Sequence, residues 1–214
     1  VVAASRMSGR AAWVVSFGGH GDLPRTLKFL CSGEQPDGSH RAPHDYGVVI
    51  ILLGVADRLV PAGQAAPLRA AIRIFLNASH LDMIDKSKAA IEFGNAREAA
   101  DRLPEPARTY MSWVNDRRVD ELGRVLLPHA AAMGDDAALS PERNPAPAMP
   151  VYLLHGADDN VIPAAESERL SNYLRARHAE VTHLVTRLIT HAEVDHPPAV
   201  AEIWRLVRFW AAPL

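Results

Sequence analysis

The stretch "VYLLHGADDNVIP", residues 151–163, decides the fold of this chain. It begins with a short apolar run that has the length of a buried strand, and Gly156 ends that run. Pro163 then stands just inside the start of an amphipathic helical pattern, "PAAESERLSNYLRARH". A second strand-like run (180–189) and a closing helical pattern (198–214) follow. Strand, helix, strand and helix in this order predict parallel βα units and therefore an α/β fold.

A different pattern precedes this part of the chain. Residues 11–17, "AAWVVSF", form another strand-like run, rich in β-branched and aromatic residues. From 44 to 135 the apolar spacing is helical, and it predicts four to six helices without a strand. Pro24 and Pro43 indicate irregular connections before these helices, and the proline-rich segment 140–150 is the clearest boundary in the chain. The predicted order is thus one strand, a helical insert and a βαβα segment.

The composition excludes several classes of protein. The chain has 214 residues, of which 48% are hydrophobic, and its formal net charge of −2 gives no support to binding of nucleic acid or of an anionic membrane surface. Cys31 is the only cysteine, which excludes an intrachain disulfide and a cysteine-based metal site. The longest apolar stretch, residues 47–56, is too short to span a bilayer. The first residues lack a signal-peptide pattern, which favours a cytoplasmic location.

Polar side chains follow all three predicted strands, at the edge where an open α/β sheet binds its ligands. They are Ser16, His20 and Asp22 after the first strand, Asp158 and Asp159 after the second, and His191, Glu193 and Asp195 after the third. An acid and a histidine on neighbouring strands are the two supporting members of a nucleophile–histidine–acid triad. In such a triad the acid orients the imidazole, and the imidazole takes the proton from the nucleophile.

The stretch "LLHGADDNVIP" resembles the acid-bearing turn of the α/β-hydrolase family, in which a strand leads through His-Gly to an aspartate and a nearby proline. Aligned on Gly156 and Pro163, the acid position falls on Asp159 rather than on Asp158. His191, 32 residues after Asp159, has the place at which the family carries its histidine. The resemblance therefore makes Asp159 and His191 the candidate catalytic residues.

The resemblance covers residues 145–214 well, and it extends to "WVVSFGG" near the N-terminus. It implies a parallel-sheet α/β-hydrolase core, incomplete at its N-terminus, with an inserted helical lid. The implied domains are a first core segment (1–32), the lid (33–144) and the C-terminal core (145–214). The implied activity is hydrolysis of a small carboxylic ester with an apolar acyl or aryl group, without a metal ion or an organic cofactor.

The sequence identifies the nucleophile less directly than the acid and the histidine. In this family the serine lies in a small-x-Ser-x-small elbow that runs straight into a helix. Ser16 has Gly18 on one side, but Val14 fills the other small position, and "GGHGDLPR" cannot form two regular helical turns. We therefore expect the nucleophile upstream of Val1, with "VVAASR" as the end of its helix and residues 11–17 as the next strand.

Two alternatives stay open. In the first, Ser16, His191 and Asp159 form the triad of a minimal hydrolase. In the second, the chain is a non-catalytic hydrolase-like module that binds an apolar ligand or a partner protein. A sheet without its N-terminal half would also expose an edge, through which we expect self-association.

Plainer readings apply to several residues. Asp159 could instead cap the helix that follows it, which is a common role for an aspartate. His155 reads as a structural residue at the end of a strand. The tracts "HRAPH" and "THAEVDH" lack the ligand spacing of a metal site, so we predict no metal at either. The aromatic residues of the last helix read as its packing face, namely Trp204, Phe209 and Trp210.

Overall fold

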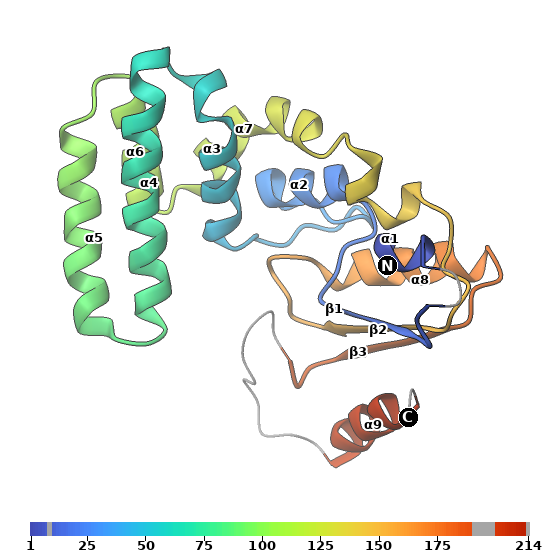
Figure 1. The fold of residues 1–214 in the computed structure, drawn as a ribbon. Coiled ribbons are helices and arrows are strands. Elements are labelled where there is room, and N and C mark those ends of the chain that lie inside the picture. The colour runs from blue at the N-terminus through green and yellow to red at the C-terminus, as the bar shows by residue number, and fades with distance from the viewer. Residues whose placement is uncertain (8–9, 190–199, 213–214) are drawn as a thin grey trace. The chain divides into compact units, whose positions relative to one another are not determined.

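The computed structural model describes residues 1–7, 10–189 and 200–212 (Figure 1). The chain divides into two compact units. Unit 1 consists of Val1–Phe29, Gly33–Ala42 and Ala131–Leu214. Unit 2 consists of Leu30–Ser32 and Pro43–Ala130. All the candidate site residues of the sequence belong to unit 1.

Within the described residues, unit 1 is built around a parallel sheet of three strands. They lie in the order β1 (Val14–Phe17), β2 (Val151–Gly156) and β3 (Val181–Thr186). Val14 pairs with Val151, which in turn pairs with Val181. The central strand β2 is buried along its whole length, as its apolar sequence predicts. The α/β class and the parallel arrangement are therefore confirmed.

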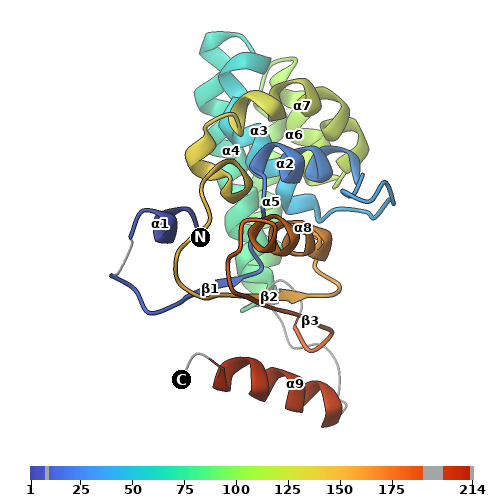
Figure 2. The same ribbon diagram turned by 90° about the vertical axis from the view of Figure 1, so that its right-hand side faces the viewer.

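Helices cover the two faces of this sheet. Outside region 45–133, the helical elements of the described chain are α1 (Val2–Ser5), α2 (Leu23–Ser32), the 3₁₀ helices η1 (Ala137–Leu139) and η2 (Pro141–Arg143), α8 (Ala164–Arg175) and α9 (Val200–Ala211). Helices α8 and α9 lie on opposite faces (Figure 2). Because side chains alternate along a strand, Val151 and Leu153 pack against α8, whereas Tyr152 and Leu154 pack against Phe209 of α9.

Helix α2 corrects one sequence prediction. Pro24 does not mark an irregular connection, because it lies in the first turn of this helix. A first-turn residue has no helical partner for its N–H, so proline is tolerated there. Asp22 caps the helix by accepting a hydrogen bond from the backbone N–H of Arg25. Gly33 ends it in the left-handed conformation, with φ 71°.

Helices alone occupy region 45–133 of the described chain. They are α3 (Asp45–Leu59), α4 (Ala62–Asp82), α5 (Lys86–Asp101), α6 (Ala107–Asn115) and α7 (Val119–Met133). Their number lies within the predicted four to six. Leu68, Ile72 and Phe75 of α4, which the helical spacing places on one face, are all fully buried. Phe75 meets the ring of Phe93 on α5 edge-on, and the side chain of Asp85 caps α5.

The aromatic residues of α9 depart from the sequence prediction. Phe209 is buried against Tyr152, with their ring centroids 6.0 Å apart. Trp204 and Trp210, however, are 62% and 44% exposed, so their assignment to the packing face is wrong. The reason is geometric, since the α9 face of the sheet receives Phe209 and Leu206 and the two indoles lie on other sides of the helix.

Candidate functional site

The candidate acid, Asp159, lies just past the carboxyl end of the central strand β2 and is 1% exposed. Its Oδ1 accepts hydrogen bonds from the backbone N–H groups of Val161 and Ile162, both at 2.9 Å. These bonds close a tight turn of the kind that aspartate favours. The alternative in which Asp159 caps α8 is wrong, because the N-cap residue of α8 is Pro163 and no side chain caps that helix.

His155 supports the same turn from inside the protein. Its side chain is fully buried, and its Nε2 lies 2.8 Å from the carbonyl oxygen of Ile162. Since a carbonyl oxygen can only accept, Nε2 carries the proton and donates. The same nitrogen lies 3.5 Å from Oδ2 of Asp159. His155 therefore contacts both ends of the turn that holds the candidate acid.

Arg41 holds this turn from its outer side. Its Nη1 donates to the carbonyl oxygens of Ala157 and Asp159, at 3.3 and 3.4 Å. Its Nη2 lies 3.5 Å from Oδ1 of Asp158, whose side chain is 55% exposed. Sequence reasoning missed Arg41, because the residue stands in "HRAPH", more than 100 positions before the turn that it contacts, and carries no local signal.

Ser16 lies in β1, opposite Leu153 of β2. Its hydroxyl group is packed against the loop that follows the strand, since a Cβ on Gly19 would stand 2.4 Å from Ser16 Oγ. The next helix, α2, begins only at Leu23, so a loop of five residues separates it from the strand end at Phe17. Ser16 is thus not placed on a strand that runs directly into a helix.

The loop after β1 is fastened to the start of α8 by charged side chains. The carboxylate of Glu166, fully buried in the first turn of α8, accepts hydrogen bonds from the backbone N–H groups of Gly21 and Asp22. Arg25 pairs with both Glu166 and Glu142, at 2.6 and 2.7 Å. Burial disfavours the charged guanidinium, but the hydrogen bonds to these two carboxylates outweigh it and raise the pKa of Arg25. A partly buried ionic cluster therefore joins the first turn of α2 to the first turn of α8 and to η2.

His20 and Asp22, which follow β1, have structural partners. Nε2 of His20 lies 3.0 Å from the carbonyl oxygen of Leu139. Asp22 caps α2 and accepts a hydrogen bond from Arg143 at 2.8 Å. Both contacts tie the loop after β1 to the segment that leads into β2.

The candidate base, His191, lies outside the described residues, as do Glu193 and Asp195. Their assignment stays a prediction. In the described part of the chain, no group of three or more His, Cys, Asp or Glu side chains could hold a metal ion. None of the described helices is long and apolar enough to cross a membrane.

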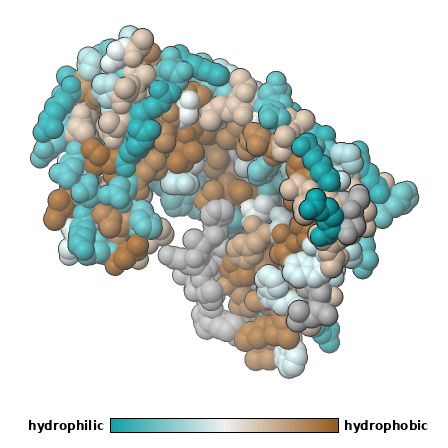
Figure 3. All heavy atoms as spheres, viewed as in Figure 1, coloured by the Kyte–Doolittle hydropathy of each residue, from teal (hydrophilic) through white to brown (hydrophobic). Residues whose placement is uncertain are grey.

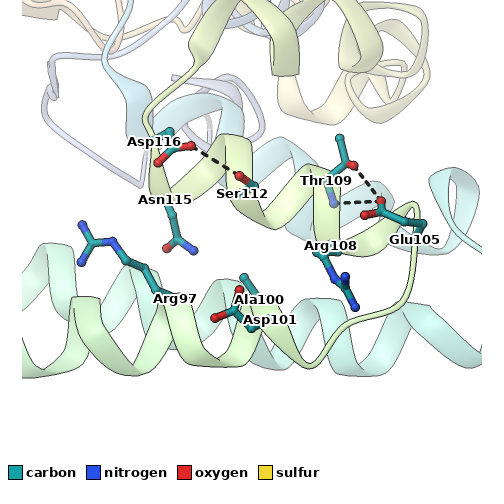
Figure 4. A pocket seen from close by; sticks show the side chains of 9 residues that line it. All are labelled: Arg97, Ala100, Asp101, Glu105, Arg108, Thr109, Ser112, Asn115 and Asp116. Atoms are coloured by element: carbon teal, nitrogen blue, oxygen red, sulfur yellow. Dashed lines mark hydrogen bonds between the residues drawn. The ribbon is translucent and has the colours of Figure 1, made fainter.

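A groove of about 430 Å³ lies between α5 and α6 in unit 2 (Figure 4). Its lining consists of Arg97, Ala100, Asp101, Glu105, Arg108, Thr109, Ser112, Asn115 and Asp116. Several of these side chains bond to each other, since Thr109 donates to Glu105 and Ser112 to Asp116. The lining has no histidine, cysteine or fully buried polar side chain, so the groove offers no hydroxyl or thiol paired with an imidazole.

No protein-family model matches this sequence, and comparisons with curated proteins and with solved structures gave no match. A functional assignment therefore depends on the geometry around Asp159 and on the motif that contains it.

Proposed function

We propose that this chain carries the acid and the histidine of a serine hydrolase that cleaves carboxylic esters. The observation that carries the proposal is the buried carboxylate of Asp159, fixed by two backbone amides just past the end of the central strand. A buried aspartate held in this way is suited to orient an imidazole and to stabilise its protonated form.

The strand order supports the pairing of Asp159 with His191. Because β2 and β3 are parallel neighbours, the segments that follow them start at the same edge of the sheet. Asp159 follows β2, and His191 lies five residues after the end of β3 at Thr186. In the proposed fold, the three strands are the last strands of an α/β-hydrolase core, and helices α3–α7 are the inserted lid.

In the proposed reaction, a serine Oγ attacks the ester carbonyl carbon while His191 accepts the hydroxyl proton. The proton then passes to the departing alcohol, and water releases the acid from the acyl-enzyme by the same route in reverse. Asp159 holds His191 throughout. The substrate is a small ester with an apolar acyl or aryl group, and the serine precedes Val1 in the polypeptide.

Ser16 is the second candidate for the nucleophile. It lies near the carboxyl end of β1, but the loop of five residues between β1 and α2 argues against it. The elbow of a hydrolase places its serine at a helix N-terminus, whose amides support the oxyanion.

Hydrolysis of p-nitrophenyl butyrate tests the proposal, measured with the natural polypeptide that contains residues 1–214 and with residues 1–214 alone. We expect Asp159→Asn to lower kcat of the active form by about 10³–10⁴-fold, and His191→Ala by at least as much. Asparagine still accepts the two backbone hydrogen bonds, so the turn is kept. Asp158→Asn, at the exposed neighbour, is the matched control and leaves kcat unchanged.

The outcomes separate the alternatives. Turnover by residues 1–214 that disappears in Ser16→Ala would make Ser16 the nucleophile. Equal losses in Asp158→Asn and Asp159→Asn would contradict the assignment of the acid. A folded natural polypeptide without any turnover would favour the non-catalytic module instead.

A further inference from the structure

The geometry points to His155 as a positioning residue that fixes the carboxylate of Asp159 in one orientation. Its relevance to catalysis rests on the proposed function, whereas the contact itself does not. The sequence reading treated His155 only as a residue at the end of a strand.

The two oxygens of Asp159 have different surroundings. Both backbone amides of the turn, from Val161 and Ile162, bond to Oδ1. Oδ2 instead faces the Nε2–H of His155 at 3.5 Å. At this distance the contact between Nε2 and Oδ2 is electrostatic rather than a good hydrogen bond. It still places the positive end of the imidazole dipole next to Oδ2. The amides of the turn thus hold Oδ1, and the imidazole of His155 lies on the side of Oδ2.

His155 also closes the turn itself. Its Nε2–H donates to the carbonyl oxygen of Ile162, and the N–H of the same residue donates to Asp159. The imidazole, Ile162 and Asp159 therefore form one continuous set of contacts, anchored in β2. A movement of the carboxylate would have to displace either the strand or the ring.

The chemistry of this position supports a specific role. His155 follows the apolar run "VYLL" and is fully buried, an environment in which a leucine would pack at no polar cost. Its Nδ1 is buried without a hydrogen-bond partner among the described residues, a cost that only the contacts of Nε2 offset. The partners of His155 Nε2 are the turn and its acid, so the N–H is the polar group that this position supplies to the turn.

His183 provides a built-in comparison. It lies on β3, two positions before Val185, which pairs with His155. Its Nε2 contacts Ser167 Oγ of α8 at 3.0 Å rather than the turn. The buried His155 and the partly buried His183 thus differ in whether they contact Asp159.

The test is the long-range ¹H–¹⁵N spectrum of the imidazole rings in the ¹⁵N-labelled chain of residues 1–214. His155→Gln assigns the resonances of His155 by their loss. We expect the tautomer with the proton on Nε2 and a bare Nδ1. Asp159→Asn should shift the Nε2 proton and speed its exchange with water by about tenfold, as the loss of one charged partner predicts. Asp158→Asn and His183→Gln should change neither the resonance of the His155 Nε2 proton nor its exchange rate.

A proton on Nδ1, or an equal shift in Asp158→Asn, would overturn the inference. If Asp159→Asn fails to fold, the tautomer of the unaltered chain still decides. Where ester turnover is measurable, His155→Gln keeps a donor near Nε2 and should retain kcat, whereas His155→Leu should lower kcat without changing KM. Equal losses in both variants would contradict positioning. Because the spectrum needs no substrate, absence of turnover would count against the proposed function and leave this inference standing.

Discussion

His183 shows what a partly buried polar ring does to the stability of unit 1. It lies in β3 with Nε2 3.0 Å from Ser167 Oγ. Burial, followed by the nearby Arg175 guanidinium and His155 imidazole, lowers the pKa of His183 to about 4. The folded chain therefore keeps this ring neutral at pH values at which the unfolded chain, with an ordinary histidine pKa near 6.5, takes up a proton.

The sign of the pH effect follows directly. Above about pH 6.5 neither state protonates His183, so its contribution to stability is complete there, and it is lost as the pH falls toward 4. We expect a loss on the order of 1–2 kcal/mol, discounted because the ring is only partly buried. Urea unfolding at pH 7 and pH 4.5 measures it. His183→Gln should reduce the difference in unfolding free energy between the two pH values. His80→Gln, at an exposed site on α4, should leave that difference unchanged. Parallel pH slopes in all three chains would refute this.

The residues around the candidate acid differ in how far sequence could predict them. Asp159 was identifiable because strand, glycine, acid and proline are adjacent in the chain, so a local motif records the turn. His155 was visible in that motif, but its contact with Ile162 depends on the path of the turn in space. Arg41 reaches the turn from a distant part of the chain, and no spacing rule connects the two. The place of Asp159 after a strand was therefore predictable from the local sequence, and the long-range contacts of its turn were not.

At the level of elements, alanine substitutions at two helical glycines of unit 2 should change the stability in opposite directions. A Cβ on Gly123 of α7 would stand 1.9 Å from the backbone oxygen of Cys31, which cannot rotate away. Gly94 of α5 has open space around its Cβ position. We expect Gly123→Ala to cost about 1–3 kcal/mol through overpacking, and Gly94→Ala to add about 0.5–1 kcal/mol through helix propensity. Urea midpoints of the two variants decide; a neutral Gly123→Ala would show that α7 can move aside.

The elements themselves were predicted unevenly, for physical reasons. The apolar run before Gly156 predicts strand β2, and the amphipathic pattern that starts at Pro163 predicts helix α8. Helix α2 was missed because a proline breaks a helix interior but is tolerated in a first turn. Pro24 lies in the first turn only because Asp22 is the N-cap residue, and the sequence does not show where the cap lies. The exposed faces of α9 were misjudged because amphipathic spacing shows that a helix has an apolar stripe, not what covers it.

At the level of the whole molecule, exposed apolar side chains gather on α9 (Figure 3). They are Val200, Ile203, Trp204, Val207 and Trp210. Trp13 and Phe17 beside β1 are also 41% and 51% exposed. Surfaces of this kind associate in water, and a net charge of only −2 opposes this weakly.

Residues 1–214 alone should therefore self-associate at tens of micromolar, with a mass above 23.3 kDa in light scattering. Trp204→Glu should shift the chain toward the monomer, because it places a charge in the middle of this surface. Trp113→Phe on α6 is the control and should not. A clean monomer of the unaltered chain at that concentration would contradict the prediction.

The pairing of β1 with β2 has a consequence for how this protein can change over generations. Val14 and Val151 are register partners although residues 15–150, most of them helical, lie between them. Closing such a long connection costs little more when it lengthens, since doubling it adds only about 0.6 kcal/mol. Helices α3–α6 pack mainly on neighbours close to them in the chain, and they belong to a different compact unit from the sheet. Mutations could therefore lengthen, shorten or replace the helices of region 45–133 during evolution while the turn that contains Asp159 stays unchanged.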